Sequence, residues 1–148
     1  MGLFMEENLM LEMPVLIDNA TKDLIKRAYY SAVDDMEQEE FNYINSKINI
    51  KVSITENISP EWVATLSKYY KRLHFLLEEY RNNDIKITGK SYNSIGAALF
   101  YFINPYDIIP DFTSEIGYAD DFYVLILCLD SIDQKDKEIV LSRLKIND

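Results

Sequence analysis

The segment that most constrains the fold is residues 104–121, NPYDIIPDFTSEIGYADD. It lies between two strongly apolar runs, residues 95–103 and 122–129. Its prolines, Pro105 and Pro110, interrupt helical hydrogen bonding and fix the backbone, so the chain has to turn here. Two apolar runs joined by such a turn predict a helical hairpin in the core, with residues 104–121 as its corner.

The rest of the sequence favours helices over strands. The chain has 148 residues, of which 48% are hydrophobic and 13% aromatic, and it contains only four glycines and four prolines. So few turn-forming residues leave few breaks, and a chain of this length forms one domain with a single core. We therefore predict an all-α, single-domain bundle of five or six helices over residues 18–148, preceded by an apolar, Met-rich arm at residues 1–17.

Apolar residues recur at helical spacing in several segments. The strongest pattern begins after Ser59 and Pro60, which are typical of a helix start, and it ends at the Asn82-Asn83-Asp84 break. The predicted helices cover residues 21–34, a segment through 41–48 that we expect to end near residues 47–48, residues 60–82, 91–103 and 121–129, and a last segment capped by Ser131 or Asp133.

One stretch shows a different period. Ile48, Ile50, Val52 and Ile54 are separated by single polar residues, which is the period-two pattern of a half-buried strand. Two interpretations are open: a short β-hairpin of residues 48–54 with 85–88, or an extended linker. Because one hairpin is unstable alone, a strand here would have to pack against the helices.

The formal net charge of −10 limits the partners. Phosphate backbones and anionic membrane surfaces repel such a chain, so we expect no nucleic acid and favour a basic protein surface, a second copy or a cation. Both apolar runs are well short of the roughly 20 residues that span a bilayer. We expect a cytoplasmic protein, with peripheral membrane association through residues 1–17 as an alternative.

Two residue types with useful chemistry occur once each. Cys128 lies inside VLILCLD with no positive charge nearby in sequence, so we interpret it as a buried, inert thiol. His74 lies beside the apolar face of the 60–82 helix, and we interpret it as a partly buried structural histidine. A single histidine also excludes a multi-histidine metal site.

No lysine, arginine or histidine occurs between residues 91 and 134, although this span holds seven acidic residues. Carboxylates between apolar helices need compensation. Backbone N–H groups at helix starts, basic residues of the preceding helix or Lys90, or a divalent cation could supply it. The seven acids are Asp107, Asp111, Glu115, Asp120, Asp121, Asp130 and Asp133.

Four of these acids, Asp107, Asp111, Asp120 and Asp121, lie beside turns. Helix capping and ion pairing are the favoured interpretation, and a hard-metal site in which two or more of them converge is the alternative. Adjacent residues on a helix point about 100° apart, which disfavours one ion shared by Asp120 and Asp121. Acid–base catalysis by a carboxylate pair lacks a nucleophile or histidine in the segment, so we assign no catalytic residue and no cofactor beyond this cation.

The run AALFYFINPYDIIPDFTSEIGYADDFYVL resembles the YkvA-like family, a domain-of-unknown-function family, over about residues 90–130. Its hallmark is a Pro-x-Asp-x-Ile-Pro-Asp turn followed by a Gly-Tyr-x-Asp-Asp helix start. The matching positions are Pro105, Asp107, Ile109, Pro110, Asp111, Gly117, Tyr118, Asp120 and Asp121. Thr113-Ser114-Glu115 and Asn104 depart from it. The resemblance implies a small helical domain, sometimes described as membrane-associated, with no established reaction.

Together these features predict a non-enzymatic interaction or adaptor protein, whose acidic surface binds a basic partner or a second copy. A divalent-metal-binding module or metal-dependent enzyme that uses the four aspartates is the first alternative. A peripheral membrane protein is the second.

Overall fold

The computed structural model describes residues 17–57, 61–104 and 118–145. In these residues the backbone forms helices and turns and no strand, which confirms the all-α prediction. The elements are α2 (Asn19–Asp35), α3 (Gln38–Thr55), α4 (Glu61–Arg81), α5 (Gly89–Ile103), α6 (Ala119–Ser131), a 3₁₀ turn η2 (Gln134–Asp136) and α7 (Lys137–Leu144). The predicted arm, apart from Ile17, lies outside the described residues.

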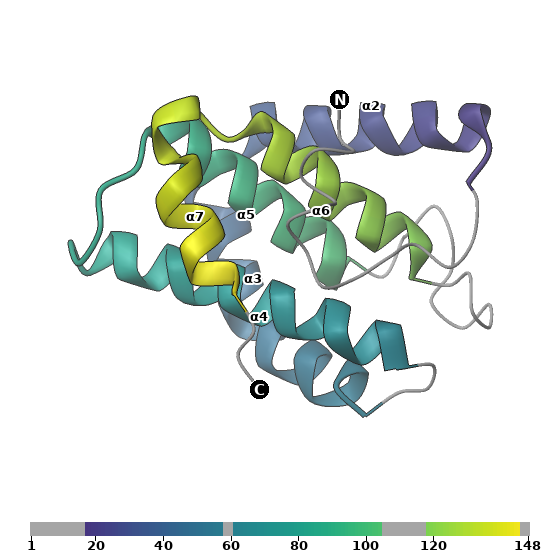
Figure 1. The fold of residues 1–148 in the computed structure, drawn as a ribbon, viewed down its shortest axis with the longest axis horizontal. Helices are drawn as coiled ribbons and strands as arrows, with labels where there is room; N and C mark the ends of the chain where they lie inside the picture. The colour runs from purple at the N-terminus through teal and green to yellow at the C-terminus, as the bar shows by residue number, and fades with distance from the viewer. Residues whose placement is uncertain (1–16, 58–60, 105–117, 146–148) are drawn as a thin grey trace.

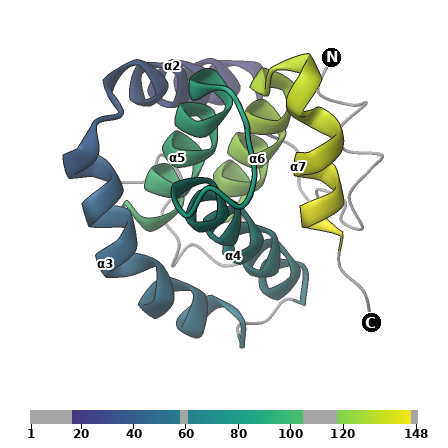
Figure 2. The same cartoon turned by 90° about the vertical axis from the view of Figure 1, so that its left-hand side faces the viewer.

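Helix α5 is the centre of the bundle. It packs against α2, α3, α4 and α6, and Figure 2 shows it enclosed by these helices. In Figure 1, α2 covers the α5–α6 pair on one side, while α3 and α4 lie on the other. Ten of the 15 residues of α5 are buried, so this helix has core contacts on most of its circumference.

Small residues let the neighbouring helices approach α5 closely. A Cβ atom added to Gly96 would lie 2.5 Å from Cε1 of Phe41 and 2.9 Å from Cε of Met36. Ala97 and Ala98, which follow, are fully buried. The close packing of Phe41 and Met36 against α5 therefore depends on the absence of a side chain at Gly96.

The acidic run of residues 34–40 forms the junction between α2 and α3. Asp18 caps the start of α2 by accepting the Thr21 N–H at 2.7 Å. At the junction the Glu40 carboxylate accepts the Glu37 N–H at 2.9 Å, which begins α3. The other acidic side chains of this run are exposed.

The β-hairpin alternative for residues 48–54 and 85–88 is wrong. The first stretch is the C-terminal part of α3, which runs to Thr55 instead of ending near residues 47–48. The second connects α4 to α5 without strand pairing, and no strand forms in the part of the chain that the structure describes.

The alternating isoleucines form two rows on one helix. Ile48 and Val52 are four residues apart and buried, whereas Ile50 and Ile54 are four residues apart and exposed. A helix places residues i and i+4 on one face, so alternation over seven residues also fits a helix with one row in the core and one on the surface. The alternating sequence alone does not distinguish these two structures.

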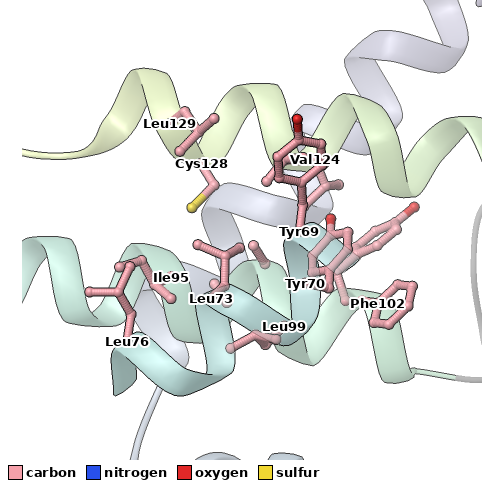
Figure 3. Close-up of a cluster of buried hydrophobic side chains, with 14 of the residues drawn as sticks. Tyr69, Tyr70, Leu73, Leu76, Ile95, Leu99, Phe102, Val124, Cys128 and Leu129 are labelled. Atoms are coloured by element: carbon pink, nitrogen blue, oxygen red, sulfur yellow. The ribbon is translucent and has the colours of Figure 1, made fainter. Parts of the chain in front are cut away.

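Helix α4 confirms the strongest helical pattern of the sequence. Its stripe is buried through the middle of the helix, and Figure 3 shows Tyr70, Leu73 and Leu76 facing side chains of α5. The helix ends near the predicted break. There Asn83 takes a positive φ of 63°, and the N–H of Asp84 bonds to the carbonyl of Glu79 at 2.8 Å.

Helix α6 is buried on almost all sides and packs along α5, as expected of the predicted hairpin. Beyond it, Asp133 caps η2, and α7 packs on α4. Measured over the described residues, no helix combines the length and the apolar character needed to cross a membrane.

Candidate functional site

The four predicted site residues fall into two groups. Asp120 and Asp121 lie in the first turn of α6 and are fully buried. Asp107 and Asp111 lie outside the described residues, so the convergence of all four carboxylates stays a prediction. We call residues 101–104 and 118–121 the α5–α6 corner.

The Asp120 carboxylate accepts two hydrogen bonds within this corner. The Tyr101 hydroxyl donates to its Oδ2 at 2.8 Å, and the Asp121 N–H donates to its Oδ1 at 3.1 Å. The N-terminus of a helix also favours negative charge. The Tyr101 bond links the end of α5 to the start of α6, and this contact gives the carboxylate a structural use.

Tyr70 of α4 fixes the next residue of the corner. Its hydroxyl donates to the backbone carbonyl of Asp121 at 2.5 Å. Its ring stacks on Phe102 with centroids 4.2 Å apart, a pair visible in Figure 3. Burial, with the nearby charge of Asp121, holds the pKa of the Tyr70 hydroxyl well above its usual value. The hydroxyl therefore stays protonated and remains a donor at neutral pH.

Positive charge reaches the corner from α3. The Lys51 ammonium lies 5.3 Å from the ring centroid of Phe102 and 5.5 Å from that of Tyr118. Both distances are in the range of cation–π attraction. Tyr118 directly precedes the first turn of α6, so Lys51 brings a cation to a segment whose own sequence has none.

Sequence reasoning missed Lys51, Tyr70 and Tyr101 as partners of the acidic segment. Lys51 lay in the stretch interpreted as a strand or linker, and basic compensation was expected from the helix of residues 60–82, which precedes the acidic span, or from Lys90. The four-residue spacing of Ile48 and Val52 was the signal that could have extended α3 and placed Lys51 beside its buried row.

A third buried acid lies at the opposite end of α5. Asp136, which is 4% exposed, accepts hydrogen bonds at its Oδ2 from the Ser91 hydroxyl (2.6 Å), the Thr88 hydroxyl (3.0 Å) and the Thr88 N–H (3.0 Å). Burial alone would raise the pKa of Asp136, but these hydrogen bonds outweigh it and hold the pKa below its usual value. This carboxylate ties η2 to the start of α5.

His74 and Cys128 have the environments that the sequence predicted. The Nε2 of His74 is hydrogen-bonded to Oδ1 of Asn45 at 2.9 Å, and burial lowers the pKa of His74. Cys128 is fully buried, and burial raises its thiol pKa to about 12. A thiol with this pKa is protonated at neutral pH and therefore a poor nucleophile.

Across residues 17–57, 61–104 and 118–145, no three His, Cys, Asp or Glu side chains gather in a way that could hold a metal ion. Because Asp107 and Asp111 lie outside these ranges, the four-aspartate site is a prediction that this geometry does not address.

The corner is also where the chain matches a known family. Residues 94–127 match the family described as "Protein of unknown function (DUF1232)". We call these residues the DUF1232 segment. The segment contains most of α5 and the start of α6, and the match is consistent with the YkvA-like resemblance.

One curated relative shares a short stretch with the chain. It is the E3 ubiquitin-protein ligase RNF170 of Xenopus tropicalis, which is 46% identical over 48 residues. The alignment covers 32% of this chain and 19% of RNF170, so the matched stretch is about a fifth of that protein. No solved structure matches the chain.

Proposed function

We propose that this protein is a non-enzymatic interaction module that binds, along the exposed face of α3, a protein surface that carries basic and apolar side chains, either on another protein or on a second copy. One observation carries the proposal: Tyr43, Ile50 and Ile54 form an apolar row on the outside of that helix. The side chains of Ile50 and Ile54 are 61% and 57% exposed, more than the other large hydrophobic residues on the described surface.

These residues align on one helix face. They are seven and four residues apart, which corresponds to two turns and one turn of an α-helix. Single exposed hydrophobic residues need no explanation, but several on one helix face can form part of a docking surface. We call Tyr43, Ile50 and Ile54 the α3 row; the exposed Lys47 lies on the same face, one turn after Tyr43 and before Ile50.

Charge indicates which partner the α3 row would accept. Glu39 is one turn before Tyr43, and Asp34, Asp35 and Glu37 precede it at the junction of α2 and α3. All four acidic residues are exposed. We call them the acidic junction. An apolar row with acids at one end complements a surface that has both apolar and basic side chains.

The buried acids support a scaffold role for the DUF1232 segment. Asp120 and Asp136 are used in hydrogen bonds between elements, where they hold the bundle together. The description of RNF170 as an E3 ubiquitin-protein ligase concerns a protein of which 19% is matched, and the proposed function does not rest on it.

Site-specific photo-crosslinking tests the proposal. A photoreactive residue at Ile50 should form adducts with a second copy of the chain or with an identified basic protein that also binds when purified. Ile54→Glu should weaken that binding at least about tenfold, because a charge would be buried against apolar surface. Leu24 is the matched control, since it is 52% exposed but lies on α2.

Equal crosslinking from positions 24 and 50 would contradict the proposal. So would a purified partner whose affinity is unchanged by Ile54→Glu.

A divalent-cation site is a second candidate, motivated by the full burial of Asp120 and Asp121, of which one would bind the ion because adjacent helical side chains point about 100° apart. Asp107 and Asp111 would complete it. An ion present at 100 times its Kd should stabilise the fold by roughly 2.7 kcal/mol. Thermal unfolding with Ca²⁺, Mg²⁺ and Mn²⁺ measures this, and no shift with any of the three would rule the candidate out.

Peripheral membrane association through residues 1–17 is a third candidate, motivated by the apolar character of that arm. In a flotation gradient, liposomes should carry the full chain upward and should not carry a chain without residues 1–17. Equal behaviour of the two chains would refute it.

A further inference from the structure

The outer face of α4 combines basic and aromatic side chains. Lys68, Lys71, Arg72 and Phe75 occur at positions i, i+3, i+4 and i+7, which form one face of a helix. Phe75 is 50% exposed, and Lys68 and Lys71 are exposed. We call these four residues the α4 face. No ion pair within the described residues involves its three cations.

This face has the chemistry that the proposed function requires of a partner. It offers an exposed aromatic ring for the α3 row and three cations for the acidic junction. The acidic junction has four exposed carboxylates. The two surfaces of this one chain are therefore complementary in both apolar character and charge.

The two surfaces belong to one helical hairpin. Thr55 Oγ1 is hydrogen-bonded to Ser67 Oγ at 2.6 Å, and Asn45 Oδ1 to His74 Nε2 at 2.9 Å. These contacts make α3 and α4 antiparallel neighbours, as Figure 2 shows. When two complementary surfaces lie on adjacent helices, one two-fold axis can satisfy both of them at once.

We propose that the protein forms a homodimer in which the α4 face of each copy docks on the α3 row and acidic junction of the other. The inference rests on the proposed function and names its partner as a second copy. Phe75 would cover the α3 row, while the lysines contact the carboxylates. The net charge of −10 does not prevent this, because solvent screens repulsion between exposed charges beyond about 8 Å at physiological salt.

Charge reversal with rescue is the decisive experiment. D34K/D35K and K68E/K71E each place like charges in the interface, so each should weaken self-association at least about tenfold in sedimentation velocity. The quadruple variant with all four exchanges has the natural net charge and again has opposite charges facing each other. Its dimerisation should return to within a few-fold of the natural chain.

A matched control separates the interface from general charge effects. K26E/R27E changes the net charge by the same amount as K68E/K71E, but on α2. We expect this variant to dimerise like the natural chain. Circular dichroism should show native helicity in every variant, since all exchanged side chains are exposed and a lysine is favourable at the C-terminal end of α2.

A natural chain that remains monomeric at high concentration would overturn the dimer. So would charge-reversed variants that associate normally, or a quadruple variant that fails to recover. A monomeric chain that still crosslinks a basic protein from position 50 would overturn only this inference and would leave the proposed function standing. A chain that neither dimerises nor crosslinks any protein from position 50 would overturn the dimer and the proposed function together.

Discussion

At the scale of single residues, buried carboxylates link the elements of the bundle. Asp120 connects α6 to Tyr101 of α5, and Asp136 connects η2 to Thr88 and Ser91. A buried hydrogen bond to a charged group contributes about 1.5–3 kcal/mol, more than a bond between neutral groups. The acids for which the sequence left a metal site open therefore include at least one, Asp120, with a structural use.

Removal of one hydroxyl tests the corner contact. Tyr101→Phe keeps the ring and removes the donor to Asp120, so we expect the free energy of unfolding to fall by about 1–3 kcal/mol in urea denaturation. Tyr30→Phe is the control, because that side chain is 45% exposed and its change should stay within about 0.5 kcal/mol. Equal effects of both substitutions would contradict the structural use of the Asp120 bond.

The Asp136 cluster predicts a pH dependence. Because the folded pKa of Asp136 is lowered, the unfolded chain takes up its proton first as the pH falls. The contribution of Asp136 is complete above the unfolded pKa of about 3.9 and is lost as the pH falls through the folded value. Asp136→Asn should be about 1–3 kcal/mol less stable at pH 7 and should lose less stability than the natural chain between pH 6 and pH 3.

Urea unfolding at a series of pH values measures both curves. Parallel curves over the acidic range would show that the charge of Asp136 does not contribute to stability.

At the scale of elements, close packing of α3 against α5 depends on one glycine. A Cβ atom at Gly96 would meet Phe41 and Met36 at less than 3 Å, and Phe41 is also stacked on Tyr92 with centroids 4.5 Å apart. The ring of Phe41 therefore has little freedom to move aside. The approach of the two helices is set at this contact.

Gly96→Ala tests this packing. Overpacking should cost about 1–3 kcal/mol, and the better helix propensity of alanine offsets up to about 1 kcal/mol, so net destabilisation is expected in thermal unfolding. Gly89→Ala is the matched control on the same helix, since nothing lies within 4 Å of its added Cβ atom. It should leave stability unchanged or raise it. A Gly96→Ala protein as stable as the Gly89→Ala protein would refute the close contact.

At the scale of the whole molecule, Cys128 reports on global opening. It is fully buried on α6, and burial raises its thiol pKa to about 12. Reaction with a thiol reagent at pH 8 should therefore be at least about a hundredfold slower in the folded protein than in 6 M guanidinium chloride. Labelling rates followed by mass spectrometry measure this, and fast labelling of the folded chain would contradict the burial.

The same scale shows the limit of local sequence patterns. The helical stripe of α4 and the apolar character of α5 and α6 were predictable because each signal lies within one segment. The α3 helix was not, because alternation over residues 48–54 fits a strand or two rows of a helix. Only packing against α4 and α5 decides between them.

The sequence by itself determined the helical class and the two apolar helices that pair in the core, since helical periodicity and apolar character act locally. The tertiary structure decided which groups the acids meet. Tyr101 is 19 residues from Asp120, and Thr88 is 48 residues from Asp136. No local pattern encodes such separations, because these pairs form only when the helices pack. The same packing leaves Ile50 and Ile54 exposed on α3, where the proposed partner would bind.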